Sequence, residues 1–339
     1  MKLILLIPAY NEAEHLPDVI AHCPSTMEEV DKIEIIVVDD GSTDATARVA
    51  ADAGARVIRH PRRRGVGIAF TSGLDAALQS GADLICQLDA DGQHPPENIP
   101  QLLEPLLRGH AEFVTATRFS RPQDSLGMPL KRRWGNKVVA ALVRQLSGTK
   151  NLTDVACGFR AFTREVALRL NLYGGFTYTQ ESLIDLISKN IHIHEVPMRI
   201  APQRANGEGR ISGNLFRYAL LALLIIARAV RDQRPLRFFG AIGIASALLG
   251  IVQLGFVMVH WLNTGKTWPY TSLITGGAMC VILGVLLMVL ALIADMMGRH
   301  RAISEKLLYL AKREQYRAPS IAHGGEGTAS EQLTESTLR

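Results

Sequence analysis

Two long uncharged stretches near the C-terminal end constrain the fold of this chain more than any other feature. Phe238–Leu262 and Thr271–Ala294 contain no Asp, Glu, Lys or Arg, and only the eight residues Asn263–Tyr270 separate them. A helix rises about 1.5 Å per residue, so either stretch is long enough to cross a bilayer core of about 30 Å. We therefore expect a two-helix transmembrane hairpin over residues 235–297 and a separate domain before it.

Basic residues lie on one side of this hairpin. The loop between the two stretches has one lysine, Lys266, whereas both outer flanks are basic. The flanking residues are Arg228, Arg231, Arg234 and Arg237 before the hairpin, and Arg299, Arg301 and Lys306 after it. Because cytoplasmic loops carry an excess of Lys and Arg, we expect a multi-pass protein of the inner, cytoplasmic membrane whose N-terminal domain faces the cytoplasm. Buried core helices are the alternative, which the arginine-rich rim disfavours.

The segments next to the hairpin are expected to lie along the membrane surface. Residues 213–234 contain the apolar run Tyr218–Ala227, framed by Arg217 and Arg228. This run is too short to span a bilayer and suits an amphipathic helix in the headgroup region; packing under the soluble domain is the alternative. We expect a second, charged helix over residues 298–316, returning along the same surface, and a disordered tail over residues 317–339.

The first 212 residues alternate short β-type runs with stretches of helical apolar spacing. The predicted strands are Leu3–Ile7, Ile33–Val38, Arg56–Ile58, Leu84–Leu88 and Phe113–Ala116. The predicted helices are Glu12–Val30, Asp44–Ala53, Val66–Gln79 and Glu97–Arg108. Strands that alternate with helices are typical of an α/β domain with a parallel sheet covered on both faces.

Two acidic pairs follow predicted strands. Asp89-Ala90-Asp91 ends the run Leu84–Leu88, and Asp39-Asp40 ends another. Carboxylates one residue apart can reach one hard divalent cation and leave positions open for phosphate oxygens. Ligands of open α/β sheets bind at the carboxyl ends of the strands. Capping of the next helix is the alternative, and it applies best to Asp44.

The segment Pro8-Ala9-Tyr10-Asn11-Glu12 closes the first strand and opens a helix, so free amides and the flat Tyr10 ring face a ligand. Together with Val37–Asp44 and Asp89–Asp91, it resembles the nucleotide-binding half of the family 2 inverting glycosyltransferases. This resemblance implies an α/β fold: a cytoplasmic GT-A nucleotide-sugar-binding domain over residues 1–212, with a Rossmann-like mixed sheet. An interfacial helix and two transmembrane helices follow it.

The resemblance also implies roles for single residues. Asp39 would accept hydrogen bonds from the donor's base, and Asp91 would bind the Mg²⁺ or Mn²⁺ that bridges two phosphates, with Asp89 beside it as a second metal ligand and against the ribose or sugar. The whole donor-binding set is Pro8, Tyr10, Glu12, Asp39, Asp40, Gly67, Asp89, Ala90, Asp91 and Glu181.

The stretch Arg62–Ala69 resembles the family's Asn-x-Gly-x-Gly-x-Ala segment, in which glycines let the backbone pass close to the nucleotide. Here Arg63 stands where the family usually has Asn. A solvated run of charge is the alternative interpretation of Arg62, Arg63 and Arg64.

Later motifs resemble the polyprenyl-phosphate branch of the family. They are Thr153–Arg160, Glu195-Val196-Pro197, Arg204 and Gly207–Ser212, where Arg210 replaces a lysine. The implied acceptor is a dolichyl or undecaprenyl phosphate. Asp154 would orient this acceptor or take its residual proton; a structural role, as a cap or a salt bridge to Arg160, is the alternative.

A lipid phosphate as acceptor requires cations near the membrane, and arginine forks suit phosphate oxygens. The residues available are Arg118, Arg132, Arg133, Arg204 and Arg210. Because the second ionisation of a phosphate monoester lies near pH 6, the acceptor is already largely a dianion and needs little help from a base. We expect Asp154, Asp91 and Arg210 to be the catalytic residues.

The sequence thus predicts transfer of a sugar from a UDP- or GDP-linked donor to polyprenyl phosphate, with inversion. A processive polysaccharide synthase is one alternative, but Lys131–Trp134 lacks the Gln of its Gln-x-x-Arg-Trp signature. A non-catalytic, membrane-tethered nucleotide-sugar-binding protein is another, disfavoured because Asp91, Asp154 and Arg210 occur together.

Other partners are limited by composition. Aromatic residues make up 6% of the chain, too few to favour base stacking, so no nucleic acid is expected despite a pI near 9.1. His94 and the pair His192 and His194 lack further ligand spacing, and we expect no metal there. Glycines in both spans would permit close helix packing and a homo-oligomer, a dimer or tetramer.

Overall fold

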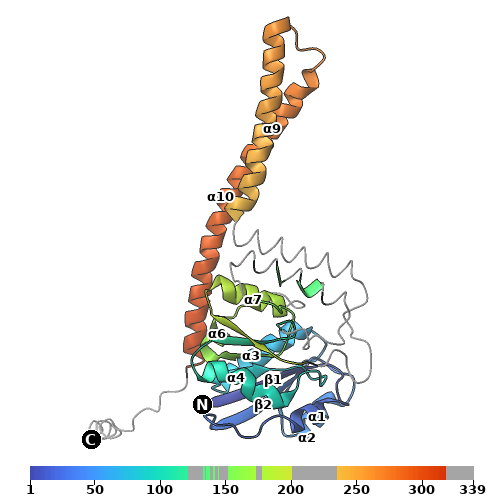
Figure 1. Cartoon of the computed structure of the whole chain (residues 1–339), viewed down its shortest axis with the longest axis vertical. Coiled ribbons are helices and arrows are strands. Elements are labelled where there is room, and N and C mark those ends of the chain that lie inside the picture. Colours follow the sequence, from blue (N-terminus) through green and yellow to red (C-terminus); the bar gives the residue numbers. More distant parts are fainter. Residues whose placement is uncertain are drawn as a thin grey trace, which may run out of the picture.

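The structure, a computed structural model, describes residues 1–120, 152–172, 178–200 and 235–317, with a few positions between 133 and 144. Figure 1 shows an α/β body from which two long helices extend. The expected surface helix over residues 213–234 and the tail after Arg317 lie outside the described residues.

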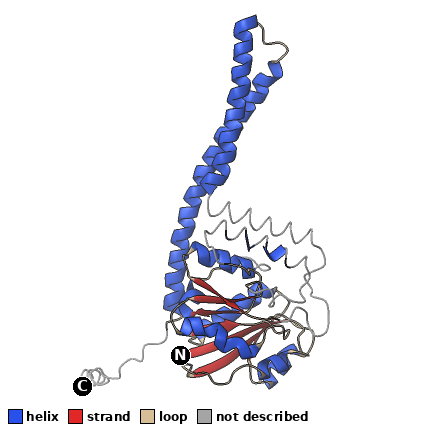
Figure 2. Cartoon of the chain, viewed as in Figure 1, coloured by secondary structure: helices blue, strands red, loops and turns tan. Residues whose placement is uncertain are grey.

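A seven-stranded mixed sheet forms the centre of the body, drawn in red in Figure 2. Its order is β3-β2-β1-β4-β6-β5-β7, in which β6 is antiparallel to both β4 and β5 and the other pairs are parallel. The strands are β1 (Lys2–Ala9), β2 (Lys32–Asp39), β3 (Arg56–Arg59), β4 (Leu84–Gln87), β5 (Phe113–Thr117), β6 (Arg160–Thr163) and β7 (Ile193–Pro197). The purely parallel sheet suggested by the strand–helix alternation is therefore wrong at β6, whereas the mixed GT-A-like sheet is confirmed.

Short helices cover both faces of this sheet. They are α1 (Leu16–Ala21), α2 (Thr46–Asp52), α3 (Val66–Gln79), the 3₁₀ helix η1 (Pro96–Asn98), α4 (Ile99–Leu107), α6 (Arg164–Arg169) and α7 (Tyr178–Ser188). Alternation along β1 divides the core, because Leu3 and Leu5 pack with residues of α1, α2 and α4, while Ile4 and Leu6 pack with α3, α6 and α7.

The local predictions agree with these elements to different extents. All five predicted strands are present, and α3 has the predicted bounds. The helix predicted over Glu12–Val30 is wrong, because only Leu16–Ala21 is helical. Pro24 has no amide hydrogen to donate, and a residue before proline disfavours helical geometry, so the chain turns there instead.

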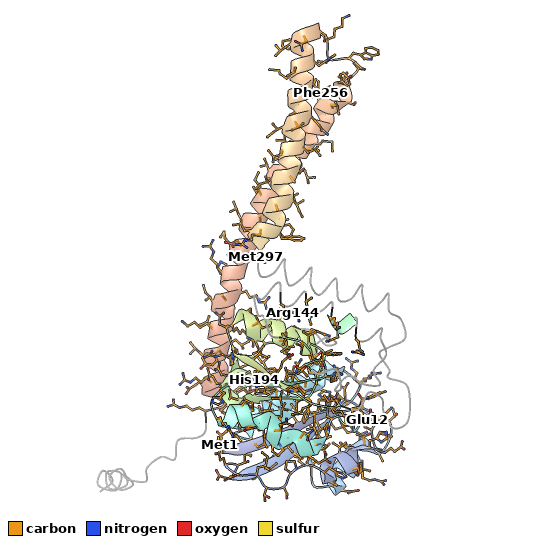
Figure 3. All side chains as sticks on the ribbon, in the orientation of Figure 1. Met1, Glu12, Arg144, His194, Phe256 and Met297 are labelled. Atoms are coloured by element: carbon orange, nitrogen blue, oxygen red, sulfur yellow. The ribbon has the colours of Figure 1, made fainter. Side chains whose placement is uncertain are left out.

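Helices α9 (Pro235–Thr264) and α10 (Thr271–Gln315) are both long and apolar enough to cross a membrane. Their apolar side chains mostly point outward in Figure 3, with Phe256 near the tip of the hairpin and Met297 near its base. The two helices touch where glycines face each other: a Cβ on Gly250 would lie 2.5 Å from the Gly277 carbonyl oxygen, and one on Gly284 would lie 2.6 Å from that of Gly243. Small residues at these crossings allow the backbones to approach.

The second long helix does not end at the expected membrane boundary. With 45 residues, α10 is about 68 Å long, and it continues through Gly298 to reach the α/β body (Figure 1). The separate helix expected over residues 298–316 is therefore wrong as a distinct element. A single glycine costs a helix only about 1 kcal/mol, which is too little to break it.

Candidate active site

The site lies where β1, β2 and β4 end side by side. Ala9 pairs with Asp39 in the sheet, and β4 runs parallel to β1 on its other side. The segments that follow these strands, at Tyr10, Asp40 and Asp89, therefore meet at one edge of the sheet. This is the edge at which open α/β sheets bind ligands.

The two carboxylates of the Asp89-Ala90-Asp91 motif stand on a tight turn. Gly92 has φ +71°, and the Gln93 amide donates to Asp91 Oδ1 at 3.1 Å. The Asp89 amide donates to His94 Nδ1 at 3.0 Å, so the proton of a neutral His94 ring is on Nε2, which lies 3.6 Å from Asp89 Oδ2. Asp89 and Asp91 are partly exposed, whereas Ala90 and His94 are buried.

Residues of the Thr153–Arg160 motif form the back wall of this turn. A Cβ on Gly158 would lie 3.1 Å from Asp89 Oδ1 and 3.3 Å from Oδ2, so a larger side chain would push the carboxylate. The Phe159 ring stacks on His94 with 5.2 Å between the ring centroids. Two motifs that are about 65 residues apart in sequence therefore make one unit.

The donor atoms at this turn fit a divalent ion that arrives with phosphates. Among the described residues, no group of three or more His, Cys, Asp or Glu side chains could hold a metal by itself. Asp89 and Asp91 can supply two carboxylates, and Mg²⁺ sites commonly combine one or two carboxylates with substrate phosphates. His192 Nδ1 lies 3.1 Å from the carbonyl oxygen of His110.

A pocket lies at the same edge of the sheet, at the end of β2. It is open, with a volume of about 280 Å³, and is lined by Gly41, Ser42, Arg59, His60 and Pro61. Asp39 is fully buried beside these residues; its Oδ1 accepts from the Ser42 amide at 2.9 Å, and its Oδ2 lies 3.2 Å from Arg59 Nε. Arg59, which lines the pocket and is largely exposed, can donate to a flat polar ligand, and the buried Asp39 carboxylate behind it orients its guanidinium.

The arginine loop is held against this pocket. Asp40 accepts from the amides of Arg64 and Gly65 and from His60, at 2.7 to 2.8 Å, so this carboxylate shapes the wall of the pocket. Gly41, at φ +71°, leaves room for the backbone of Arg62 and Arg63, which a Cβ would meet at 2.5 to 2.6 Å.

Arg63 is not simply a solvated charge. Its guanidinium lies 4.3 Å from the centroid of the Tyr10 ring, and Tyr10 directly follows β1.

The other predicted donor-binding residues lie on the neighbouring elements. Pro8 is the seventh residue of β1, and the amide of Glu12 donates to Thr46 at 2.9 Å, which ties the turn after β1 to α2. Asp44 lies one residue before the N-cap of α2, Ala45, and its Oδ1 accepts from the amide of Thr46, the first residue of that helix. Gly67 is buried in the first turn of α3.

Asp154 pairs with a different arginine from the expected one. Arg118 donates to its carboxylate from Nε at 2.7 Å and Nη2 at 3.0 Å, whereas Arg160 donates to Ser182 and to the Thr179 carbonyl. The suggested Asp154–Arg160 bridge is therefore wrong. Arg160 instead ties β6 to the start of α7, where Glu181 is partly exposed.

Part of the predicted acceptor site cannot be placed. Arg132, Arg204 and Arg210 lie outside the described residues, and Arg133 is a half-buried helical position. Their roles stay predictions.

Comparison with known proteins decides the family. Residues 4–170 match the model of glycosyl transferase family 2. A UDP-N-acetylglucosamine–dolichyl-phosphate N-acetylglucosaminyltransferase from Methanococcus voltae is 31% identical over 222 residues, which are 58% of this chain and 85% of that protein. The chain belongs to glycosyl transferase family 2.

Other similar proteins match more of the chain. An undecaprenyl-phosphate 4-deoxy-4-formamido-L-arabinose transferase from Pseudomonas aeruginosa is 29% identical over 304 residues, 87% of this chain and 84% of that protein. The crystal structure of glucosyl-3-phosphoglycerate synthase from Mycobacterium tuberculosis, in complex with Mn²⁺, UDP and glucosyl-3-phosphoglycerate, is also similar. It matches with a TM-score of 0.51 and 26% identity, over 66% of this chain and 79% of that one. A divalent ion beside a nucleotide is therefore consistent with this fold.

Three residues of the family 2 site were not assigned a role from the sequence: Arg59, His94 and Glu195. Glu195 belongs to the Glu195-Val196-Pro197 motif, and His94 follows Asp89 by five residues. Neither pattern predicts which residue the side chain contacts. Arg59 ends a strand without any motif, and only the pairing of β2 with β3 places it beside Asp39.

Proposed function

We propose that this protein transfers a sugar from a nucleoside diphosphate sugar to polyprenyl phosphate at a membrane surface, with inversion at the anomeric carbon. The observation that carries the proposal is the Asp89–Asp91 turn, backed by Gly158 and Phe159, at the carboxyl edge of the sheet. Relatives that transfer sugars to dolichyl and undecaprenyl phosphate support the acceptor class.

The donor would lie across the strand ends. Its base would enter the pocket beside Asp39 and Arg59, and its diphosphate would lie at Asp89 and Asp91, which would hold Mg²⁺ or Mn²⁺. Such an ion neutralises the charge that grows on the departing nucleoside diphosphate. Glu181, on α7, would read sugar hydroxyls, and Tyr10 with Arg63 would border the nucleotide.

The chemistry requires little proton transfer from the protein. A phosphate oxygen of the acceptor forms a bond to the anomeric carbon while the bond from that carbon to the diphosphate oxygen breaks. The acceptor is largely a dianion at neutral pH, so arginines that place it matter more than a base. We assign that placement to Arg118 and to Arg132, Arg133, Arg204 and Arg210.

The membrane hairpin brings this chemistry to its lipid substrate. Residues 235–297 span the bilayer, residues 213–234 lie at its cytoplasmic surface, and residues 1–212 form the catalytic domain on that side. A homo-oligomer is compatible with the small residues of the spans, although α9 and α10 already use Gly243, Gly250, Gly277 and Gly284 within one chain.

The proposal is tested with the purified full-length chain, labelled UDP- and GDP-sugars, Mg²⁺ or Mn²⁺, and polyprenyl phosphate. We expect a labelled lipid that extracts into organic solvent with at least one donor. Asp91→Ala should lower its formation by at least about 100-fold, as loss of a group that stabilises charge does. No labelled lipid from the wild-type protein with any donor would contradict the proposal, and a water-soluble labelled polymer would indicate a polysaccharide synthase.

A further inference from the structure

The corner Thr153–Asp154 is held by hydrogen bonds from several elements. The Thr153 amide donates to both carboxylate oxygens of Glu195, at 2.8 and 2.9 Å, and its hydroxyl donates to Glu195 Oε2 at 2.7 Å. The same hydroxyl lies 2.7 Å from that of Thr117, and the Thr153 carbonyl accepts from Asn136 at 2.9 Å. Every polar atom of Thr153 is therefore bound within the protein.

Glu195 also binds the next residue. The Asp154 amide donates to Glu195 Oε1 at 2.8 Å, so one carboxylate on β7 receives three donor groups from two consecutive residues. Glu195 stands opposite Thr115 in the pairing of β7 with β5, and Arg118 follows the end of β5. The carboxylate thus ties the corner to the same pair of strands that carries Arg118.

The Asp154 carboxylate is saturated by donors. It accepts from Arg118 Nε and Nη2, from the Arg118 amide at 3.3 Å and from the Ala156 amide at 3.1 Å, and the residue is 0% exposed. A general base must reach the proton that it removes. A buried carboxylate that already accepts four hydrogen bonds is placed to hold Arg118 rather than to receive a proton.

Arg118 is consequently a fixed cation. Two of its three guanidinium nitrogens donate to Asp154, a bidentate geometry that sets the plane of the group. Burial by itself lowers the pKa of Arg118, but the Asp154 carboxylate raises it overall, and Asp89 acts in the same direction. The charge therefore persists close to the Asp89–Asp91 turn, where phosphates are expected.

We propose that Glu195 is a positioning residue, which fixes the Thr153–Asp154 corner and through Asp154 holds the Arg118 guanidinium in the orientation that transfer requires. This inference rests on the proposed function. A charged group that is already fixed where charge develops during the reaction stabilises the transition state without having to move. A displacement of such a group by about 1 Å can lower the rate about 100-fold.

Two substitutions of Glu195 test whether its hydrogen bonds position the Thr153–Asp154 corner or whether any side chain of similar size is sufficient. Glu195→Ala removes all acceptors, and we expect kcat to fall by about 10- to 100-fold while the donor KM stays within about twofold. In Glu195→Gln, the amide oxygen can still accept from the Thr153 and Asp154 amides, and the Thr153 hydroxyl can reverse to accept. We expect this variant to recover at least about one third of the wild-type kcat.

A matched control is Asp185→Asn. Asp185 is also a buried acid that binds a backbone amide, that of Asn171, and a basic side chain, Lys189, but on the side of α7 near α10. We expect its kcat to stay within about twofold of wild type. Wild-type kcat in Glu195→Ala, or equal losses in Glu195→Ala and Glu195→Gln, would overturn the positioning role.

A double-substitution cycle tests the route through Arg118 even where Glu195→Ala is poorly stable. Arg118→Lys is measured alone and together with Glu195→Gln and Glu195→Ala. If Glu195 acts through Arg118, replacing Glu195 should lower kcat little further in a protein that already carries Arg118→Lys. If instead the fold-losses in kcat of the two single variants multiply in the double variant, the proposal is overturned. A wild-type protein that makes no labelled lipid refutes the transferase itself and this role with it; an active wild type with an unaffected Glu195→Ala refutes only the role.

Discussion

At the scale of single residues, the Asp89 carboxylate packs directly against Gly158, where an added Cβ would lie 3.1 Å from Oδ1. Gly158 has no positive φ, so its small size rather than its backbone freedom is what the site uses. Asp89 is also held by the hydrogen bond that its backbone amide donates to His94 Nδ1, and the His94 ring packs on Phe159. The carboxylate therefore has one well-defined place, which depends on two neighbouring motifs.

Gly158→Ala tests this contact. The added methyl group would lie 3.1 Å from Asp89 Oδ1, so the carboxylate must shift by a few tenths of an ångström. We expect roughly a tenfold lower kcat, since small misplacements are costly in a preorganised site, together with a higher Mn²⁺ concentration for half-maximal rate. Steady-state assays over a Mn²⁺ series measure both.

The control is Gly298→Ala, on α10, where an added Cβ meets nothing within 4 Å. Alanine is the better helix former there, so this variant should keep its rate and be no less stable. If Gly158→Ala keeps both the rate and the Mn²⁺ dependence of the wild type, the contact has no role in catalysis.

At the scale of elements, α10 joins the membrane hairpin to the α/β body without a break. Near its C-terminal end, Tyr309 donates to Glu165 at 2.9 Å, and Lys312 donates to the Leu170 carbonyl at 3.0 Å. Arg164 also donates to the Tyr316 carbonyl. These bonds, each worth about 0.5–1.5 kcal/mol, hold the α/β body against the C-terminal part of α10.

The pair Tyr309→Ala and Lys312→Ala removes two of these contacts. Because a loosely tethered body presents its site to the lipid less often, we expect transfer to polyprenyl phosphate to fall at least about fivefold. Binding of the nucleotide donor, measured by calorimetry, should not change, since its site lies on the body itself. The pair Lys306→Ala and Arg313→Ala changes exposed positions of the same helix and should leave transfer intact. Equal losses in both double variants would argue against docking.

At the scale of the whole molecule, the charge distribution predicts an orientation. The connecting loop between α9 and α10 has one basic residue, Lys266, whereas Arg237 of α9 and Arg299 and Arg301 of α10 lie at the opposite end of the hairpin. Because positively charged segments stay in the cytoplasm, the tip of the hairpin should face the other side of the membrane from the catalytic body.

Thiol labelling tests this orientation in intact cells that make the protein. With Cys23 and Cys280 changed to serine, Thr267→Cys should react with a maleimide that cannot cross membranes, and Arg313→Cys should react only after the cells are permeabilised. Cys86 and Cys157 are buried and should contribute little background. If only Arg313→Cys is labelled in intact cells, the protein has the opposite orientation.

Much of this protein was predictable from local sequence. Helix α3 and the five N-terminal strands follow from apolar spacing, the two spans from length without charge, and Asp89 and Asp91 from their place after a buried strand. These features are encoded by neighbouring residues, because periodicity, turn chemistry and hydropathy act over a few positions.

Only the tertiary structure decided which of these residues meet. Strand β6 enters the sheet antiparallel to its neighbours, Asp154 pairs with Arg118 instead of Arg160, and Glu195 binds three donor groups. Each of these contacts joins segments that are at least 36 residues apart in the sequence. Several arginines and carboxylates were chemically equivalent candidates in the sequence. Selection among them depends on sheet order and on the backbone angle at each strand end, which no local pattern contains.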